Sequence, residues 1–268
     1  MKQTKRRPIK TVIWAGAALI SAFIVLAYVA LPLFWTHFEH EPRLAALSMR
    51  TETAQHIAGD PLNVGFVGSK DEILSAFQQI GWSIADPLSL SNNLEIAESV
   101  ILDQAYSNAP VSRLFYEGRQ QDIAVEKAVG ASPEQRHHAR LWQVLEKGAT
   151  GRPVWLGAVS FDTSVGLSHF TGQFTHHIDA DIDAERNKLV KDVSEAGIVE
   201  TVYQVSGIGP TLNGRNGAND RFYTDGEVTI MVLRPGVIEA KELPEMLENP
   251  PLIRLKQTIW SAFAGTRP

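Results

Sequence analysis

The chain has 268 residues, enough for one large domain or two small ones with a buried core. It contains no cysteine, which excludes disulfides, zinc–thiolate sites and thiol nucleophiles. The net charge is -5, and five of the 25 basic residues lie in the first ten positions, so the rest of the chain is clearly acidic. An acidic body lacks the positive surface that neutralises phosphates along a nucleic acid, and we expect no nucleic-acid partner.

The first predicted element is a membrane-spanning helix. Residues 12–35 contain no charged side chain, and about 20 apolar residues are enough to cross the hydrocarbon core of a bilayer. Trp14 and Trp35 lie near its two ends, where aromatic side chains meet the headgroups. The basic tail, residues 1–11, should stay in the cytoplasm. We therefore expect a single-pass protein of the cell membrane with an extracytoplasmic C-terminal domain.

The alternative for this segment is a cleaved signal peptide. The apolar run is longer than the roughly 7–15 residues typical of such peptides. A small-x-small cleavage pattern ending at Ala30 would also put Tyr28 at a position that should be small. Both observations favour an uncleaved signal anchor.

A polar stretch and the start of a folded domain follow. We interpret residues 36–60 as a stalk, with a short helix between Leu44 and Ile57. A domain over residues 61–235 then opens with an apolar strand at 62–67. Ser69 and Glu72 have the spacing of a capping box, which predicts a helix beginning there and ending at Gly81.

The middle of the domain combines a helix with a hairpin. Residues 92–106 have an apolar face at helical spacing. Residues 138–145 and 153–161 alternate with period two, and Gly148 and Gly151 indicate the turn of a β-hairpin between them.

The last part of the domain continues this mixture of elements. We predict a helix over 181–196, strands over 198–205 and 228–233, and a long turn-rich loop over 207–226. The C-terminal tail, 236–268, contains an amphipathic helix that begins at Pro250-Pro251. We expect this helix to pack on the domain, and docking on the bilayer or a partner is the alternative. The pattern predicts an α+β fold, a mostly antiparallel sheet with flanking helices, preceded by one transmembrane helix.

Titratable side chains gather just before the helix at 181–196. In an extended segment, His177, Asp179 and Asp181 would point to one side. One imidazole and two carboxylates suit a divalent metal or acid–base catalysis. The alternative is that the aspartates cap the following helix and the histidines bond loop carbonyls.

A second His-His pair lies at the start of the predicted hairpin. His138, Arg140 and Trp142 alternate onto one face, and the hairpin brings them near Asp162 at the end of the partner strand. An imidazole beside a carboxylate is the arrangement that orients a general base. The alternative is a solvated strand face. We expect both His-His pairs to meet at a cleft edged by Asp179 and Arg215.

The loop 207–226 is the third candidate. Its glycines allow backbone amides to hold an anion, with Arg215 as a bidentate partner, although a plain surface loop explains the same turn residues. It has no P-loop pattern, and the chain has no Gly-x-Ser-x-Gly elbow and no dinucleotide fingerprint. The candidate ligand-binding residues are His137, Arg140, Trp142, His176, Arg186, Arg215 and Asn216.

Residues 60–234 resemble the LssY C-terminal-like domain family, which occurs in bacterial membrane proteins. The likeness rests on Pro61–Ser69, Gly81-Trp82, Ala109–Ser112, Arg136–Trp142, Gly151–Trp155, His176–Arg186, Gly214–Asn216 and Tyr223–Gly226. The family brings no settled reaction. Some members look fused to a lipid-phosphatase-type or DedA-like membrane region, and because one predicted span precedes the domain here, we assign no phosphatase activity.

Two functions remain. The favoured one is a membrane-anchored accessory or binding domain of the bacterial envelope, with an anionic or lipid-linked ligand or an envelope protein as partner. The alternative is a hydrolase, metal-assisted or with a histidine general base, that uses His138, His177, Asp179 and Asp181. A scaffold whose polar motifs only fix loops is a third interpretation. Catalytic groups must reach one another, so an imidazole from each pair within about 5 Å of the other and of a carboxylate would favour the hydrolase.

Overall fold

The structure is a computed structural model that describes residues 9–85, 114–130, 135–167, 174–207, 209–210, 212–236 and 242–263. The chain divides into two compact units, Met1–His40 and Glu41–Pro268. The predicted helix over 92–106 lies outside the described residues.

The first unit is a long apolar helix. It consists of α1 (Ile9–Val25), a π-helical turn η1 (Leu26–Ala30) and α2 (Leu31–Thr36). The π-helical turn ends two residues before Pro32, whose ring lacks an N–H and clashes with the carbonyl one turn earlier. From Lys10 to Thr36 the helix is long and apolar enough to cross a membrane, although a signal sequence can have the same length and composition. The predicted apolar helix is confirmed.

The second unit begins earlier than the sequence suggested. The predicted helix between Leu44 and Ile57 is wrong: the segment forms a 3-10 turn η2 (Pro42–Leu44) and strands β1 (Arg50–Thr53) and β2 (Ala58–Pro61). Leu44 is fully buried, and Thr51 donates a hydrogen bond to the Asp60 carbonyl at 2.7 Å. Residues 41–60, which we interpreted as most of a stalk, are therefore part of the folded unit.

The central sheet has nine strands in the order β15-β11-β14-β3-β9-β8-β7-β4, with β10 paired to β9. Only the pairs β3–β14 and β11–β15 are parallel among the described strands, which confirms the predicted α+β fold with a mostly antiparallel sheet. The strands are β3 (Val64–Val67), β4 (Ser83–Ile84), β7 (Ile123–Ala128), β8 (Arg136–Leu145), β9 (Val154–Leu167), β10 (Phe174–Ile178), β11 (Val199–Ser206), β14 (Glu227–Leu233) and β15 (Glu245–Met246).

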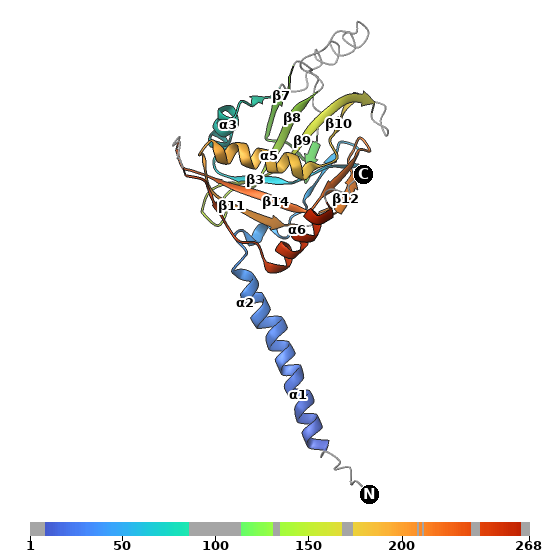
Figure 1. Ribbon diagram of the computed structural model, residues 1–268, viewed down its shortest axis with the longest axis vertical. Coiled ribbons are helices and arrows are strands. Elements are labelled where there is room, and N and C mark those ends of the chain that lie inside the picture. Colours follow the sequence, from blue (N-terminus) through green and yellow to red (C-terminus); the bar gives the residue numbers. More distant parts are fainter. Residues whose placement is uncertain are drawn as a thin grey trace. The chain divides into compact units, whose positions relative to one another are not determined.

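Two helices cover one face of this sheet. They are α3 (Lys70–Gln79) and α5 (Ile182–Glu195), and Figure 1 shows α5 lying across the strands. Phe77 of α3 and Leu189 of α5 pack against Leu141 and Val159 of the sheet in one apolar cluster. Both predicted helix starts are confirmed: Ser69 and Glu72 form a capping box, and Asp181 caps α5 by accepting from the Ala184 amide.

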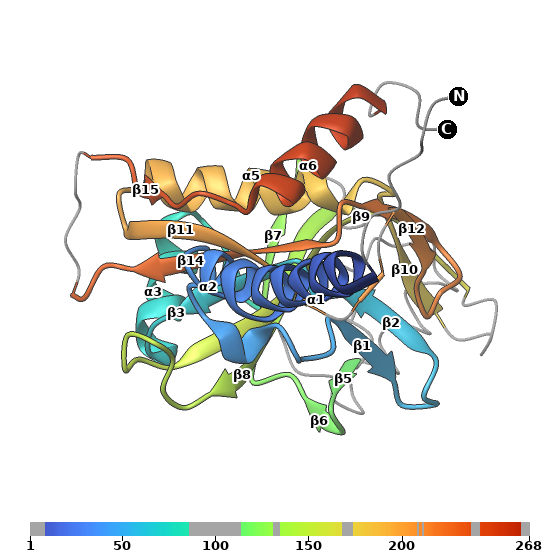
Figure 2. The same cartoon turned by 90° about the horizontal axis from the view of Figure 1, so that it is seen from below.

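A small sheet covers part of the other face, opposite α5 (Figure 2). Its order is β2-β1-β5-β6, with β5 (Leu114–Tyr116) and β6 (Arg119–Gln120). Trp142 and Leu156 of the central sheet pack here with Leu44 and Tyr116. Because side chains alternate along a strand, Arg136, His138 and Arg140 share the Trp142 face of β8, and this face carries the candidate site.

The two remaining elements lie at the end of the chain. The loop predicted over 207–226 contains a short hairpin, β12 (Leu212–Arg215) with β13 (Arg221–Thr224). The C-terminal amphipathic helix is present as α6 (Pro251–Phe263).

Candidate functional site

The site is built on the hairpin of β8 and β9. These strands pair with Arg136 opposite Asp162 and His138 opposite Ser160, so the four side chains lie on the same face of the sheet. All four are buried, and Asp162 is fully shielded from solvent. We call these residues, together with Arg140 of β8 and His176 of β10, the Asp162 centre.

A guanidinium fixes the tautomer of His138. The Arg140 Nη1 donates to His138 Nε2 at 2.9 Å. A guanidinium can only donate, so Nε2 must accept and the ring proton lies on Nδ1. His138 Nδ1 is 2.8 Å from Asp162 Oδ1, a close approach that does not meet the geometry of a regular hydrogen bond. The Ser160 hydroxyl lies 3.0 Å from the same Nε2.

His176 repeats this arrangement from the other side. The Arg136 Nη2 donates to His176 Nε2 at 2.7 Å, so this ring also carries its proton on Nδ1. His176 Nδ1 is 3.5 Å from Asp162 Oδ2, and Arg136 Nε donates to that oxygen at 3.2 Å. Two arginines thus direct two imidazoles towards a single carboxylate.

The charges of the centre follow from this geometry. Burial would raise the pKa of Asp162, but the contacts with His138, His176 and Arg136 outweigh it and hold the pKa at about 2. Burial, followed by the nearby guanidinium of Arg136, lowers the pKa of His176 to about 4, against the pull of Asp162. Burial also lowers the pKa of Arg140. At neutral pH Asp162 is ionised and His176 is neutral.

Polar contacts connect the centre to the surface in two directions. On one side, Arg136 Nη1 donates to Glu126 at 2.9 Å. On the other, Arg140 donates to Asp60 at 3.3 Å, and the Asn216 amide donates to the second oxygen of Asp60 at 3.1 Å. Asn216 also lies beside Asp220, whose carboxylate is 2.6 Å from His177 Nδ1. The His177 side chain is 32% exposed, so this branch reaches solvent.

The two His-His pairs come together as expected, but the residues around them differ from those we expected. One imidazole from each pair, His138 and His176, contacts Asp162. Asp179 and Arg215 do not edge this centre. The Asp179 side chain accepts from the Asp181 amide at 2.8 Å, and Arg215 is exposed and donates to the Asn219 carbonyl at 2.7 Å.

His177, Asp179 and Asp181 do not form one coordinating face. Strand β10 ends at Ile178, so the expected alternation stops before the aspartates. His177 turns to Asp220, and Asp181 caps α5, as the capping alternative supposed. Within the described ranges, no group of three or more His, Asp or Glu side chains is placed to hold a metal ion.

Three of the predicted ligand-binding residues have internal partners instead. His137 lies on the helix-covered face of β8, 2.9 Å from Glu185. Trp142 is fully buried and donates to the Arg119 carbonyl at 3.0 Å. Asn216 is buried and accepts from the Ala218 and Asp220 amides, so it holds the hairpin turn.

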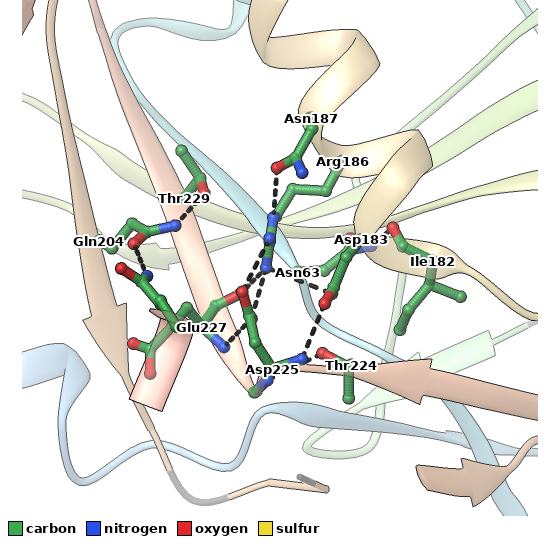
Figure 3. A network of polar contacts seen from close by, with 12 residues as sticks. Asn63, Ile182, Asp183, Arg186, Asn187, Gln204, Thr224, Asp225, Glu227 and Thr229 are labelled. Carbon is green, nitrogen blue, oxygen red and sulfur yellow. Dashed lines mark hydrogen bonds and ion pairs between the residues drawn. The ribbon is translucent and has the colours of Figure 1, made fainter. Parts of the chain in front are cut away.

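Arg186 belongs to a second buried network, drawn in Figure 3. Its guanidinium makes a bidentate contact with Asp225 at 2.8 and 3.0 Å and also donates to the Glu227 carbonyl at 2.8 Å. Asp183 lies 3.3 Å from the same Nη1. These contacts outweigh burial and raise the pKa of Arg186, whereas burial and the Asp225 charge raise the pKa of Asp183. We call Asp183, Arg186, Asp225 and Glu227 the Arg186 network.

The β12–β13 hairpin carries two exposed arginines, one on each strand. Arg215 of β12 and Arg221 of β13 are directly opposed partners, and both are exposed. In the part of the chain that the structure describes, neither guanidinium forms an ion pair with a carboxylate. Like charges opposite one another destabilise a strand pair. The two arginines therefore do not stabilise the hairpin, and their position needs another explanation.

Sequence reasoning missed several of these residues. Asp162 was expected near His138, but Ser160 was missed, although the period-two pattern of β9 places it on the same face. Nothing local to Asp60, Glu185 or Asp220 shows which partners they meet, because those contacts join distant segments.

Comparison with known proteins gives one match. Neither the curated proteins nor the solved structures contain a match to this chain. Residues 43–228 match the family model described as LssY C-terminus, which starts within the segment interpreted as a stalk and covers both polar networks. This match spans more than half of the sequence, and the chain therefore belongs to the LssY C-terminus family.

Proposed function

We propose that this chain is a membrane-anchored, extracytoplasmic binding domain of the bacterial envelope that holds an anionic ligand at the exposed β12–β13 hairpin. The opposed, exposed pair Arg215 and Arg221 carries this proposal. Guanidinium groups bind phosphate and carboxylate through paired N–H donors, and two of them side by side suit one phosphate group. Such an anion would also relieve the repulsion between the two arginines.

The other arginines that we predicted as ligand-binding residues are not available to bind an anion. Arg140 is buried and paired with Asp60, and Arg186 is buried and paired with Asp225 and Asp183. Their positive charges are already neutralised by carboxylates of the chain. Removing those carboxylates from the guanidinium groups to admit a ligand would leave buried charges without partners, which is strongly unfavourable.

The anchored topology rests on the helix from Lys10 to Thr36 and on the basic tail before it. The charge bias keeps such a tail in the cytoplasm. An alkaline phosphatase fused after Pro268 should therefore be active in cells. An inactive but intact fusion would contradict the extracytoplasmic assignment.

The binding test uses the full chain in detergent with inorganic phosphate and with short-chain phosphatidic acid as probes. The double variant Arg215→Gln/Arg221→Gln should bind the preferred probe at least about tenfold more weakly, a change of about 1.4 kcal/mol. The control Lys188→Gln/Lys191→Gln removes two positive charges from the exposed side of α5 and should bind normally. Equal affinity in all three proteins would contradict the proposal.

A second candidate function is hydrolysis, which the geometry of Ser160, His138 and Asp162 favours. The hydroxyl, the imidazole and the carboxylate follow the order nucleophile, base and orienting acid, at 3.0 and 2.8 Å. However, Arg140 also donates to the Nε2 that would accept the serine proton, so the base is partly engaged. Covalent labelling of the full chain by a fluorophosphonate, lost in Ser160→Ala and retained in Ser194→Ala, would support this function, and no labelling would contradict it.

A further inference from the structure

Helix α6 faces the domain with a mixed side that carries the half-buried Ile253 and Trp260 beside Lys256 and Gln257. Lys256 donates to the Asp225 carbonyl at 2.7 Å and pairs with Glu227 of the Arg186 network. Gln257 donates to Gln204 of β11 at 2.5 Å. These adjacent side chains fix which side of the helix faces the protein.

One apolar stripe of α6 faces away from the domain. Leu252, Leu255 and Ile259 are spaced three and four residues apart, so they form one stripe. They are 69%, 56% and 52% exposed. The helix contacts the domain, as we expected, but this stripe takes no part in the contact. A surface helix of a soluble protein has the opposite arrangement, with apolar residues inward and polar residues outward.

Further exposed apolar side chains precede the helix in the chain. Leu243 and Met246 are 74% and 65% exposed. Among the described residues of the Glu41–Pro268 unit, the other large hydrophobic side chains with comparable exposure are Ile84 and Leu212. The segment 243–259 thus concentrates exposed apolar surface, which in a soluble protein indicates a contact with another apolar body.

We propose that α6 lies in the interface of the bilayer that anchors the chain, with Leu252, Leu255 and Ile259 inserted among the lipids. This inference rests on the anchored topology of the proposed function. The apolar helix ends at Thr36 and the folded unit begins at Glu41. The few residues between them span at most about 15 Å when fully extended. The membrane is therefore always within reach of the domain, whereas a soluble partner would have to be recruited.

The neighbouring charges define which lipids this contact requires. Glu242, Glu245 and Glu248 are exposed beside the apolar stretch, and Lys256 is engaged with Glu227. Arg254 is the exposed basic residue of the described part of the helix. A surface with more acidic than basic charge gains nothing from anionic lipids. The contact is thus driven by burial of apolar side chains and works on zwitterionic membranes.

The chain contains no cysteine, so single spin labels can be placed without background. We would label Leu255→Cys in α6 and, as a matched control, Gln78→Cys on the exposed end of α3, in the full chain in phosphatidylcholine nanodiscs. Position 255 should collide with dissolved oxygen several-fold more often than with a water-soluble nickel chelate, and position 78 should show the reverse. Addition of phosphatidylglycerol should leave both results unchanged.

Three results would overturn the inference. A label at position 255 that meets the nickel chelate as readily as the label at 78 would show that the stripe lies in water. Protection of position 255 from both probes, together with two chains per nanodisc, would show that a second copy covers it. Contact that appears only with phosphatidylglycerol would show that charge, and not apolar burial, drives it.

Extraction of native membranes with alkaline carbonate separates this inference from the proposed function. A chain that is released lacks an anchor, and both proposals on topology fail. A chain that stays in the membrane while position 255 remains in water keeps its anchor, and only the assignment of α6 fails.

Discussion

The two buried polar networks use the same charged residue types in different ways. In the Arg186 network, a guanidinium contacts Asp225 directly through two parallel hydrogen bonds, and the described members include no histidine. In the Asp162 centre, Arg140 reaches the carboxylate only through His138, and Arg136 reaches it both directly and through His176. His176, inserted between Arg136 and Asp162 with a pKa lowered to about 4, makes the second network sensitive to acid.

This difference separates a network that holds elements of the fold together from a network that makes stability depend on acid. The Arg186 network joins the first turn of α5 to β14 and, through Lys256, to α6, so it fixes three elements at once. The Asp162 centre lies buried on the strand face opposite α5 and connects to the partly exposed His177 through Arg140, Asp60, Asn216 and Asp220. We therefore expect changes in the first network to act mainly on overall stability, and changes in the second to act on how stability falls in acid. The raised pKa of Asp183 gives the first network a pH dependence of the opposite sign.

The largest effect should come from Arg186→Met. It leaves Asp183 and Asp225 buried without their cation, which typically costs about 3–5 kcal/mol of unfolding free energy. Urea unfolding of the full chain in detergent measures this loss. A loss below about 1 kcal/mol would mean that the network is not a structural fastening.

Acidification should produce the next largest effect. The pKa of His176 is about 4 in the folded chain and has an ordinary value of 6.5, so between these values the unfolded chain binds a proton that the folded chain does not. Stability is therefore complete above pH 6.5 and falls as the pH drops to 4, by about 3 kcal/mol. Asp162, with its pKa lowered to about 2, adds a loss of the same sign below its ordinary value of 3.8.

The pH dependence of unfolding in the His176→Gln variant tests this assignment. The slope of unfolding free energy between pH 4 and 6.5 should flatten, while His56→Gln, which changes an exposed histidine, should keep the wild-type slope. An unchanged slope in His176→Gln would show that another group titrates.

A smaller effect is expected for Ser160→Ala. The variant removes one hydroxyl, but His138 Nε2 keeps its hydrogen bond from Arg140. We expect a loss of about 1 kcal/mol, the value of a single neutral hydrogen bond. A loss of several kcal/mol in urea unfolding would mean that Ser160, and not Arg140, holds the imidazole in place.

The smallest effect on stability should come from Arg215→Met. This guanidinium is exposed and opposes Arg221, so its removal should change the unfolding free energy by less than about 0.5 kcal/mol. It serves as the matched control for Arg186→Met in the same urea experiment. A large loss would show that Arg215 stabilises the hairpin and would weaken its assignment to a ligand.

Elements specified by local pattern were predictable from the sequence. The capping box at Ser69, the N-cap at Asp181 and the period-two hairpin of β8 and β9 depend on residues a few positions apart, and all are confirmed. The segment 44–57 was predicted wrongly because its strands are stabilised by distant partners, such as Glu52 opposite Phe115. Tertiary pairing overrides local helical pattern in such segments.

The contacts of the candidate site also divide into those that a local pattern predicts and those that it does not. The nearness of His138 to Asp162 followed from the hairpin, and the approach of His176 follows because β10 folds back on β9. The contacts of Arg140 with Asp60 and of His137 with Glu185 join residues that no local pattern connects. Arg186 lies three residues after Asp183 on a helix, a spacing that indicates a structural ion pair and argued against its choice as a ligand residue.

The position of β3 has a consequence for biogenesis. This strand lies between β9 and β14, and its partner residues Val64 and Thr229 come from the two ends of the domain's sequence. The middle of the sheet cannot close until nearly all of the domain has been synthesised, and topologies of this kind fold slowly. In the orientation proposed above, the secretion machinery therefore meets a chain whose sheet is still incomplete, and the chain can be threaded across the membrane before it folds.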